Sequence, residues 1–125
     1  MYRIDKIGEN VLYLKVLGAL NPPVAERLVK EFEEKTKVLE NFSVIVDGLD
    51  MLLMELKSFE IILNLLKRNN EKLVKSAYVI GPNPALTAET KIMLERAESP
   101  KRKLVASLDE AKEWLGISAI SIQRD

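Results

Sequence analysis

The chain has 125 residues, of which 47% are hydrophobic and 30% are charged, as is usual for a globular protein with one core. Its 19 basic and 19 acidic residues give no net charge, which argues against nucleic-acid binding because such proteins carry a basic excess. The sequence contains no cysteine and no histidine. This excludes disulfides, thiolate metal sites, the serine–histidine–aspartate triad and the commonest general base.

No segment is apolar for long enough to cross a bilayer, and the first residues lack the apolar stretch of a signal peptide. We therefore expect a cytoplasmic protein without a membrane span, folded as a single domain over residues 1–125. The composition predicts no cofactor, no metal site and no catalysis by the chain itself.

The first elements predicted along the chain are a pair of strands and a helix. Tyr2–Ile7 and Val11–Leu17 have strand character, and Gly8–Asn10 between them fits a hairpin loop. Apolar residues alternate along the second strand, which predicts a sheet covered on one face and partly covered on the other. Asn21-Pro22-Pro23 is a strong helix start, and the helical pattern continues to about Leu39.

The stretch that follows predicts a buried strand and the loop that leaves it. Phe42–Val46 is short, apolar and rich in β-branched residues, as central strands are. Asp47-Gly48 then indicates a tight turn, and Leu49–Leu56 an apolar loop. A helix begins near Phe59 and is expected to close at Asn69-Asn70.

The last third of the chain predicts two further strand–helix units. Ser76–Ile80 is another buried strand, which Gly81–Pro84 ends before a helix that runs to Ala97. Lys103–Ala106 is a short strand, and the helix after it runs from the cap residue Ser107 to Gly116. The tail after it (residues 117–122) is expected to form an edge strand or to contact a second chain.

This order of elements, ββαβαβαβα, predicts an α/β fold. Strands that alternate with helices favour right-handed crossovers and parallel pairing. We therefore expect a mixed, mostly parallel sheet of four to five strands with about four helices.

From about Ile4 to Leu115 the chain resembles the STAS domain, the family of the anti-sigma factor antagonists, in its SpoIIAA-like branch. The residues that carry the resemblance are Ile45-Val46-Asp47 at the end of a central strand, the apolar turn into the helix at Phe59, and the ending Val105–Leu115. The resemblance implies a STAS-like fold and binding to an anti-sigma factor or a serine-kinase-like protein. It also implies regulation of transcription.

The same resemblance implies a phosphorylation switch, and here the sequence departs from the family. Members carry an Asp-Ser-Ser-Gly-like turn at the start of the second helix. Counting forward from Asp47, these positions hold Glu55, Leu56, Lys57 and Ser58. Ser58 is the one nearby hydroxyl and a candidate phosphoacceptor, or else a helix cap or solvent-facing serine. We predict that it is not a regulatory site.

Candidate partner-binding residues lie just beyond the central strand, where open α/β sheets usually place their sites. They are Asp47, Asp50, Met51, Leu53, Met54, Glu55 and Ser58. Methionine suits adaptable binding surfaces. Part of the apolar run Leu49, Met51, Leu52, Leu53 and Met54 is therefore expected to be an exposed patch for a partner or for a second copy of the chain. The alternative is that the run is core over the end of the sheet. The loop Gly81–Pro84 is a candidate rim of the same surface.

Two other chemistries compete for these positions. Three carboxylates, Asp47, Asp50 and Glu55, could hold Mg²⁺ with waters, but turn formation and solubility are the favoured explanation because no phosphate loop or further ligand set accompanies them. The basic triplet Lys101–Lys103 could contact a phosphate or an acidic partner, but it is expected to be a solvated loop.

An alternative function follows from the similarity of some SpoIIAA-like domains to CRAL-TRIO lipid-binding domains. It is the binding of a small hydrophobic, lipid-like ligand between the sheet and a helix. The cavity would be lined by Leu53, Phe59, Ile62 and Tyr78.

Overall fold

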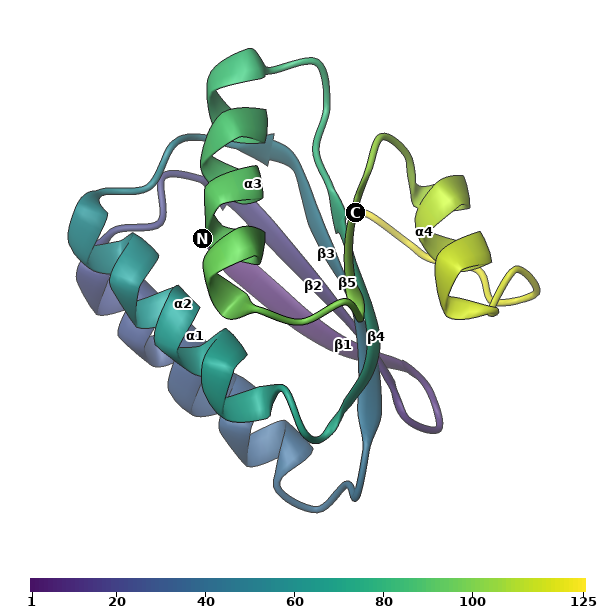
Figure 1. Ribbon diagram of the computed structural model, residues 1–125. Coiled ribbons are helices and arrows are strands. Elements are labelled where there is room, and N and C mark those ends of the chain that lie inside the picture. Colours follow the sequence, from purple (N-terminus) through teal and green to yellow (C-terminus); the bar gives the residue numbers. More distant parts are fainter.

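Five strands and four helices follow one another in the predicted order in the computed structural model, which describes residues 1–125 (Figure 1). They are β1 (Tyr2–Gly8), β2 (Val11–Gly18), α1 (Pro22–Thr36), β3 (Phe42–Met51), α2 (Leu56–Asn69), β4 (Leu73–Val79), α3 (Pro84–Ala97), β5 (Arg102–Val105) and α4 (Leu108–Leu115).

The strands form one sheet in the order β1-β2-β3-β4-β5. β1 is antiparallel to β2, and the other neighbours are parallel. Three consecutive crossovers of the same hand place α1, α2 and α3 on one face of the sheet, while α4 lies on the other (Figure 1). The predicted α/β class and mostly parallel sheet are confirmed.

Side-chain alternation along the strands divides the core between the two faces. On the helical face, Leu14 and Val44 pack with Leu28 and Phe32 of α1. On the opposite face, Tyr13, Ile45, Ala77 and Val79 pack under α4. Both faces are therefore covered, the second by a shorter helix and the C-terminal tail.

The helix starts follow from the predicted caps. The Asn21 and Asn83 side chains accept hydrogen bonds from the backbone N–H groups of Val24 and Leu86, at 3.3 and 3.1 Å, and prolines follow both. At α4, the Ser107 hydroxyl accepts from Glu110 N at 3.2 Å. Each cap satisfies an N–H group that the first helical turn leaves without a partner.

α3 and α4 end at Ala97 and before Gly116 as predicted, whereas the ends of α1 and α2 differ from the predictions. α1 stops at Thr36, whose hydroxyl donates to the carbonyl of Phe32 at 2.9 Å, rather than near Leu39. Asn70 closes α2 in a right-handed conformation (φ −54°), not the left-handed one expected. The left-handed position falls instead on Glu98 after α3, with φ 54°.

The prediction of a tight turn at Asp47-Gly48 is wrong, because β3 continues through both residues to Met51. β2 extends alongside as far as Gly18 and supplies backbone partners there, Leu17 opposite Asp50 and Gly18 opposite Met51. A Cβ atom on Gly48 would lie 2.8 Å from Cδ1 of Ile80 and 3.3 Å from the backbone carbonyl oxygen of Val79, so a larger residue there would require its neighbours to shift.

The C-terminal tail (residues 117–125) does not form an edge strand, which was one of the two alternatives predicted for residues 117–122. It crosses the face of the sheet opposite α1–α3, where Ile117 and Ile122 pack against the core. Nη2 of Arg3 donates to the carbonyl of Gln123 at 2.5 Å, and the Lys15 ammonium donates to the carbonyl of Arg124. The apolar residues of the tail thus cover the chain's own sheet.

Candidate functional site at the carboxyl end of the central strand

A bulge in β3 places Asp47 and Asp50 on the same side of the sheet. Pairing with β2 shifts from Lys15 opposite Asp47 to Leu17 opposite Asp50, which inserts one extra residue into β3. In a regular strand, residues three apart point to opposite faces, and the extra residue cancels this alternation. Both carboxylates consequently reach Arg124 of the tail.

Asp47 is fully buried and hydrogen-bonded on all sides. It accepts from the Tyr13 hydroxyl at 2.5 Å, from Nε of Arg124 at 2.7 Å and from the backbone N–H of Leu49 at 3.1 Å. Burial by itself would raise the pKa of this carboxyl group, but the bonds from Arg124, Tyr13 and Leu49 outweigh it and lower the pKa. Burial and the Asp47 charge raise the pKa of Tyr13.

These contacts change the interpretation of the carboxylates. A partner at the surface cannot reach Asp47, which ties the tail to the sheet. Asp50 is exposed and pairs with Nη2 of Arg124 at 2.7 Å. Glu55 is the exposed residue before α2, with no side-chain capping bond. Among the residues 1–125, no three acidic side chains are grouped closely enough to hold a metal ion.

The loop after β3 and the first turn of α2 expose three leucines, which we call the leucine patch: Leu52, Leu53 and Leu56. Their exposed fractions are 58%, 50% and 72%. Exposed leucine side chains grouped in this way often mark an interaction surface. Only Leu53 was among the predicted contact residues. Leu52 belonged to the apolar run for which an exposed patch and core were both left open, and Leu56 was missed because helical spacing alone does not reveal where α2 leaves the core.

The two predicted methionines lie behind this patch. Met51 and Met54 are half-buried and pack against the core on the helical face. Part of the apolar run is therefore core, and another part of it is exposed. The backbone N–H of Met54 donates to the carboxylate of Glu89 on α3 at 3.3 Å. Burial raises the pKa of Glu89, more than the bond from Met54 lowers it.

Ser58 lies in the first turn of α2 but faces inward. Its side chain is 0% exposed, and its hydroxyl oxygen has no hydrogen-bond partner. It is neither the helix cap nor a solvent-facing serine. A phosphate added here would need the start of α2 to leave the sheet.

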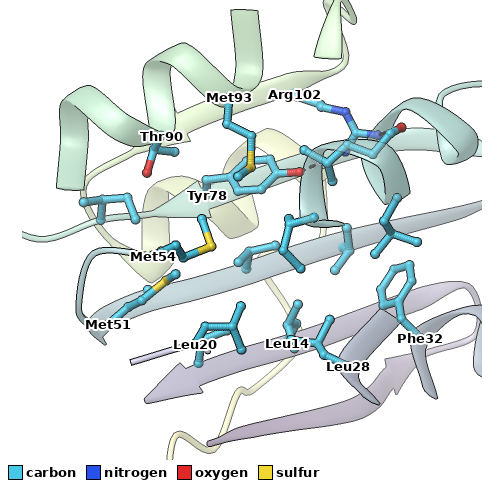
Figure 2. Close-up of a pocket in the computed structure, with 18 of the residues that line it drawn as sticks. Leu14, Leu20, Leu28, Phe32, Met51, Met54, Tyr78, Thr90, Met93 and Arg102 are labelled. Carbon is cyan, nitrogen blue, oxygen red and sulfur yellow. Dashed lines mark hydrogen bonds between the residues drawn. The ribbon is translucent and has the colours of Figure 1, made fainter. Parts of the chain in front are cut away.

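A cavity of about 80 Å³ lies between the sheet and helices α1, α2 and α3. Of its 21 lining residues, 17 are hydrophobic, and Met51, Met54 and Met93 are among those drawn in Figure 2. Ile62 and Tyr78 line it as predicted, whereas Leu53 faces solvent and Phe59 packs elsewhere in the core. The cavity lies between the sheet and the helices as predicted, but only two of the four residues predicted to line it do so.

The basic triplet Lys101–Lys103 was predicted to be a solvated loop, and this prediction is wrong. Arg102 begins β5, is 8% exposed and borders the cavity. Lys101 donates from Nζ to the carbonyl of Asn70 at 2.9 Å. Strand alternation accounts for the difference within β5, where Lys103 is exposed and Arg102 points toward the helical face.

The loop Gly81–Pro84 lies beside the bulge. A Cβ atom on Gly81 would be 3.5 Å from Cδ2 of Leu49. β3 and β4 are parallel neighbours, so their carboxyl ends meet at one edge of the sheet.

No helix in the structure has both the length and the apolar character that a membrane span requires.

No protein-family model matches the sequence, and neither does any curated protein. Among solved structures, the chain is similar to an uncharacterized protein of the DUF3478 family with a SpoIIAA-like fold, from Shewanella loihica PV-4, with a TM-score of 0.71 and 15% identity over 92% of each chain. It is also similar to the anti-sigma factor antagonist SpoIIAA in its unphosphorylated form, with a TM-score of 0.66 and 9% identity over 93% of this chain and 98% of that one. At such identities the likeness establishes a fold and not a function. The chain has a SpoIIAA-like fold.

Proposed function

We propose that this chain is a cytoplasmic, non-catalytic regulatory domain that binds an anti-sigma factor or a serine-kinase-like protein. The observation that carries the proposal is the leucine patch at the start of α2, where apolar side chains face solvent. Burial of apolar surface contributes about 25 cal/mol per Å², which would favour association there. The SpoIIAA-like fold supports the same direction, since the solved SpoIIAA is named an anti-sigma factor antagonist.

The proposed contact surface keeps Asp50, Leu53 and Glu55 of the predicted set and adds Leu52 and Leu56. The side chains of Met51 and Met54 support this surface from behind. Asp47 and Ser58 act on it indirectly, through the bulge and the first turn of α2. We propose that binding is not controlled by phosphate on Ser58, because the hydroxyl is enclosed.

Affinity capture from a lysate of the native host tests this proposal. The wild-type chain should recover an anti-sigma factor or a serine-kinase-like protein, and the Leu53→Asp/Leu56→Asp variant should not. Val38→Asp is the matched control, because Val38 is also an exposed apolar residue (84%) and follows α1, away from the patch. Circular dichroism establishes that each variant is folded.

Recovery of the same partner by the Leu53→Asp/Leu56→Asp variant would reject the leucine patch as the contact surface. Light scattering over a range of concentrations tests whether a second copy of the chain binds the leucine patch instead. A dimer that dissociates in the same variant would replace the regulatory partner with self-association.

A second candidate function is the binding of a small hydrophobic ligand, and the cavity between the sheet and α1–α3 favours it. A water molecule's share of liquid volume is about 30 Å³, so a volume of about 80 Å³ accommodates a short apolar group. The three methionines in its wall are flexible enough to adapt to one. Titration with short-chain alcohols, followed by calorimetry, would detect such binding.

A further inference from the structure

The apolar cavity has one cationic side chain in its wall. Arg102 lies at the end of the cavity opposite Met51 and Met54 (Figure 2). Its exposed fraction is only 8%. None of the molecule's ion pairs includes it. Buried charges in proteins are normally paired with an opposite charge, so this guanidinium lacks a counter-ion.

The present partners of Arg102 are neutral. Its Nη2 donates to the carbonyl of Leu66 at 2.8 Å and to Oδ1 of Asn70 at 3.1 Å, and its Nε donates to the same Oδ1 at 3.3 Å. These acceptors belong to the carboxyl end of α2, whose dipole favours a cation. They hold the guanidinium in place without neutralising it.

Two hydrogen-bond donors remain next to each other on residues of the cavity wall. Nη1 of Arg102 donates to the hydroxyl oxygen of Tyr78 at 2.9 Å, which leaves the second Nη1 hydrogen without an acceptor. The Tyr78 hydroxyl accepts this bond, and no hydrogen bond from its own proton is formed. Tyr78 is 5% exposed, and both residues line the cavity.

We propose that the cavity binds a small apolar monocarboxylate, with its carboxylate on Arg102 and Tyr78 and its hydrocarbon chain toward the methionines. A carboxylate has two acceptor oxygens and would take both free donors while supplying the missing negative charge. The volume of about 80 Å³ limits the chain to a short one. This proposal rests on the second candidate function, the binding of a hydrophobic ligand.

The test compares propionate with 1-propanol, which have the same three-carbon chain but differ in charge. Calorimetry with the wild-type protein should show propionate binding about tenfold or more tightly than 1-propanol, because only the carboxylate supplies the negative charge that the buried guanidinium lacks. Tyr78→Phe keeps the ring and removes the hydroxyl, and Arg102→Met removes the charge. Arg102→Met should lose the preference for propionate, Tyr78→Phe should reduce it, and both variants should retain 1-propanol binding.

The outcomes separate the two proposals. Equal binding of propionate and 1-propanol to the wild type would overturn the carboxylate site and leave a hydrophobic-ligand function in place. Binding of neither compound would overturn both. A preference for propionate that is undiminished in Tyr78→Phe or in Arg102→Met would also overturn the assignment to these residues. Tyr78→Phe keeps the test decisive if Arg102→Met does not fold.

Discussion

Two buried serines have hydroxyl oxygens without any hydrogen-bond partner, Ser58 in α2 and Ser76 in β4. Both side chains are 0% exposed. Leaving a buried polar group unpaired costs about 1–3 kcal/mol. Both residues therefore lower the stability of the fold in the state described.

We expect Ser58→Ala and Ser76→Ala to leave the free energy of unfolding unchanged or to raise it by about 1 kcal/mol, because each removes an unpaired group. Thr36→Val is the control, since the Thr36 hydroxyl is buried but bonded to the carbonyl of Phe32. It should lower the free energy by about 1 kcal/mol. Urea unfolding measures all three, and a loss at both serines equal to that at Thr36 would contradict the prediction.

The pair Tyr13–Asp47 predicts how stability depends on pH. The pKa of Tyr13 is raised in the folded state by burial and by Asp47, so its contribution is complete below the ordinary tyrosine pKa of about 10. It is lost as pH rises above that value, where the unfolded chain ionises first. The pKa of Asp47 is lowered, so its contribution is lost as pH falls below the ordinary aspartate value of about 3.9.

We therefore expect the wild type to lose stability between about pH 10 and 12 more steeply than Tyr13→Phe, which has no phenol to ionise at this position. Urea unfolding at a series of pH values measures the two slopes. Equal slopes would show that Tyr13 does not contribute to the alkaline limb.

At the scale of elements, the end of α3 is a place where the chain adopts an unfavourable backbone conformation. Glu98 is left-handed (φ 54°) at a position where helices usually have glycine. Gly116 fills the equivalent position after α4, with φ 73°.

Glu98→Gly should raise the free energy of unfolding by about 1 kcal/mol, because glycine removes the steric cost of a left-handed residue. Gly116→Ala should lower it by a similar amount for the reverse reason. Thermal unfolding measured for both variants checks the pair, and opposite signs are required.

The bulged strand β3 gives a second prediction at this scale. Gly48 lies against Ile80 and the backbone carbonyl of Val79, at 2.8 and 3.3 Å from a Cβ placed on it. Gly48→Ala should therefore cost about 1–3 kcal/mol, as overpacking does. Gly81→Ala is the control, since its Cβ would make only an ordinary contact at 3.5 Å. Similar losses in both variants, measured by urea unfolding, would contradict a specific steric role for Gly48.

At the scale of the whole molecule, the C-terminal tail connects to the centre of the sheet through Arg124. This side chain pairs with Asp47 and with Asp50, residues 77 and 74 positions away in the sequence. Its removal would leave the buried carboxylate of Asp47 without a cation, and unpaired buried charges are costly.

Arg124→Gln should lower the free energy of unfolding by about 2 kcal/mol, less than for a fully enclosed pair because Arg124 is one-third exposed. Arg68→Gln removes an exposed ion pair with Glu33 and should change it by less than about 1 kcal/mol. Chemical unfolding compares them. If Arg124→Gln is as mild as Arg68→Gln, the tail does not stabilise the sheet.

Local patterns in the sequence were enough to predict the order of elements and most helix starts. Asn21, Asn83 and Ser107 cap their helices through bonds to residues three positions away, so the information lies within one turn. The same holds for the buried strands, whose apolar runs are continuous. The α/β class was accordingly predicted from the order of these elements, and the SpoIIAA-like fold from the family resemblance that the residues at their ends carry.

Long-range packing decided the rest. Asp47-Gly48 has the sequence of a turn, yet it forms strand because β2 offers backbone partners to β3 as far as Met51. The tail covers the sheet because Arg124 meets a carboxylate that only the folded chain brings near. The exposure of Leu56 and the enclosure of Ser58 and Arg102 likewise depend on which side of an element meets the core, and that is a property of the assembled layers.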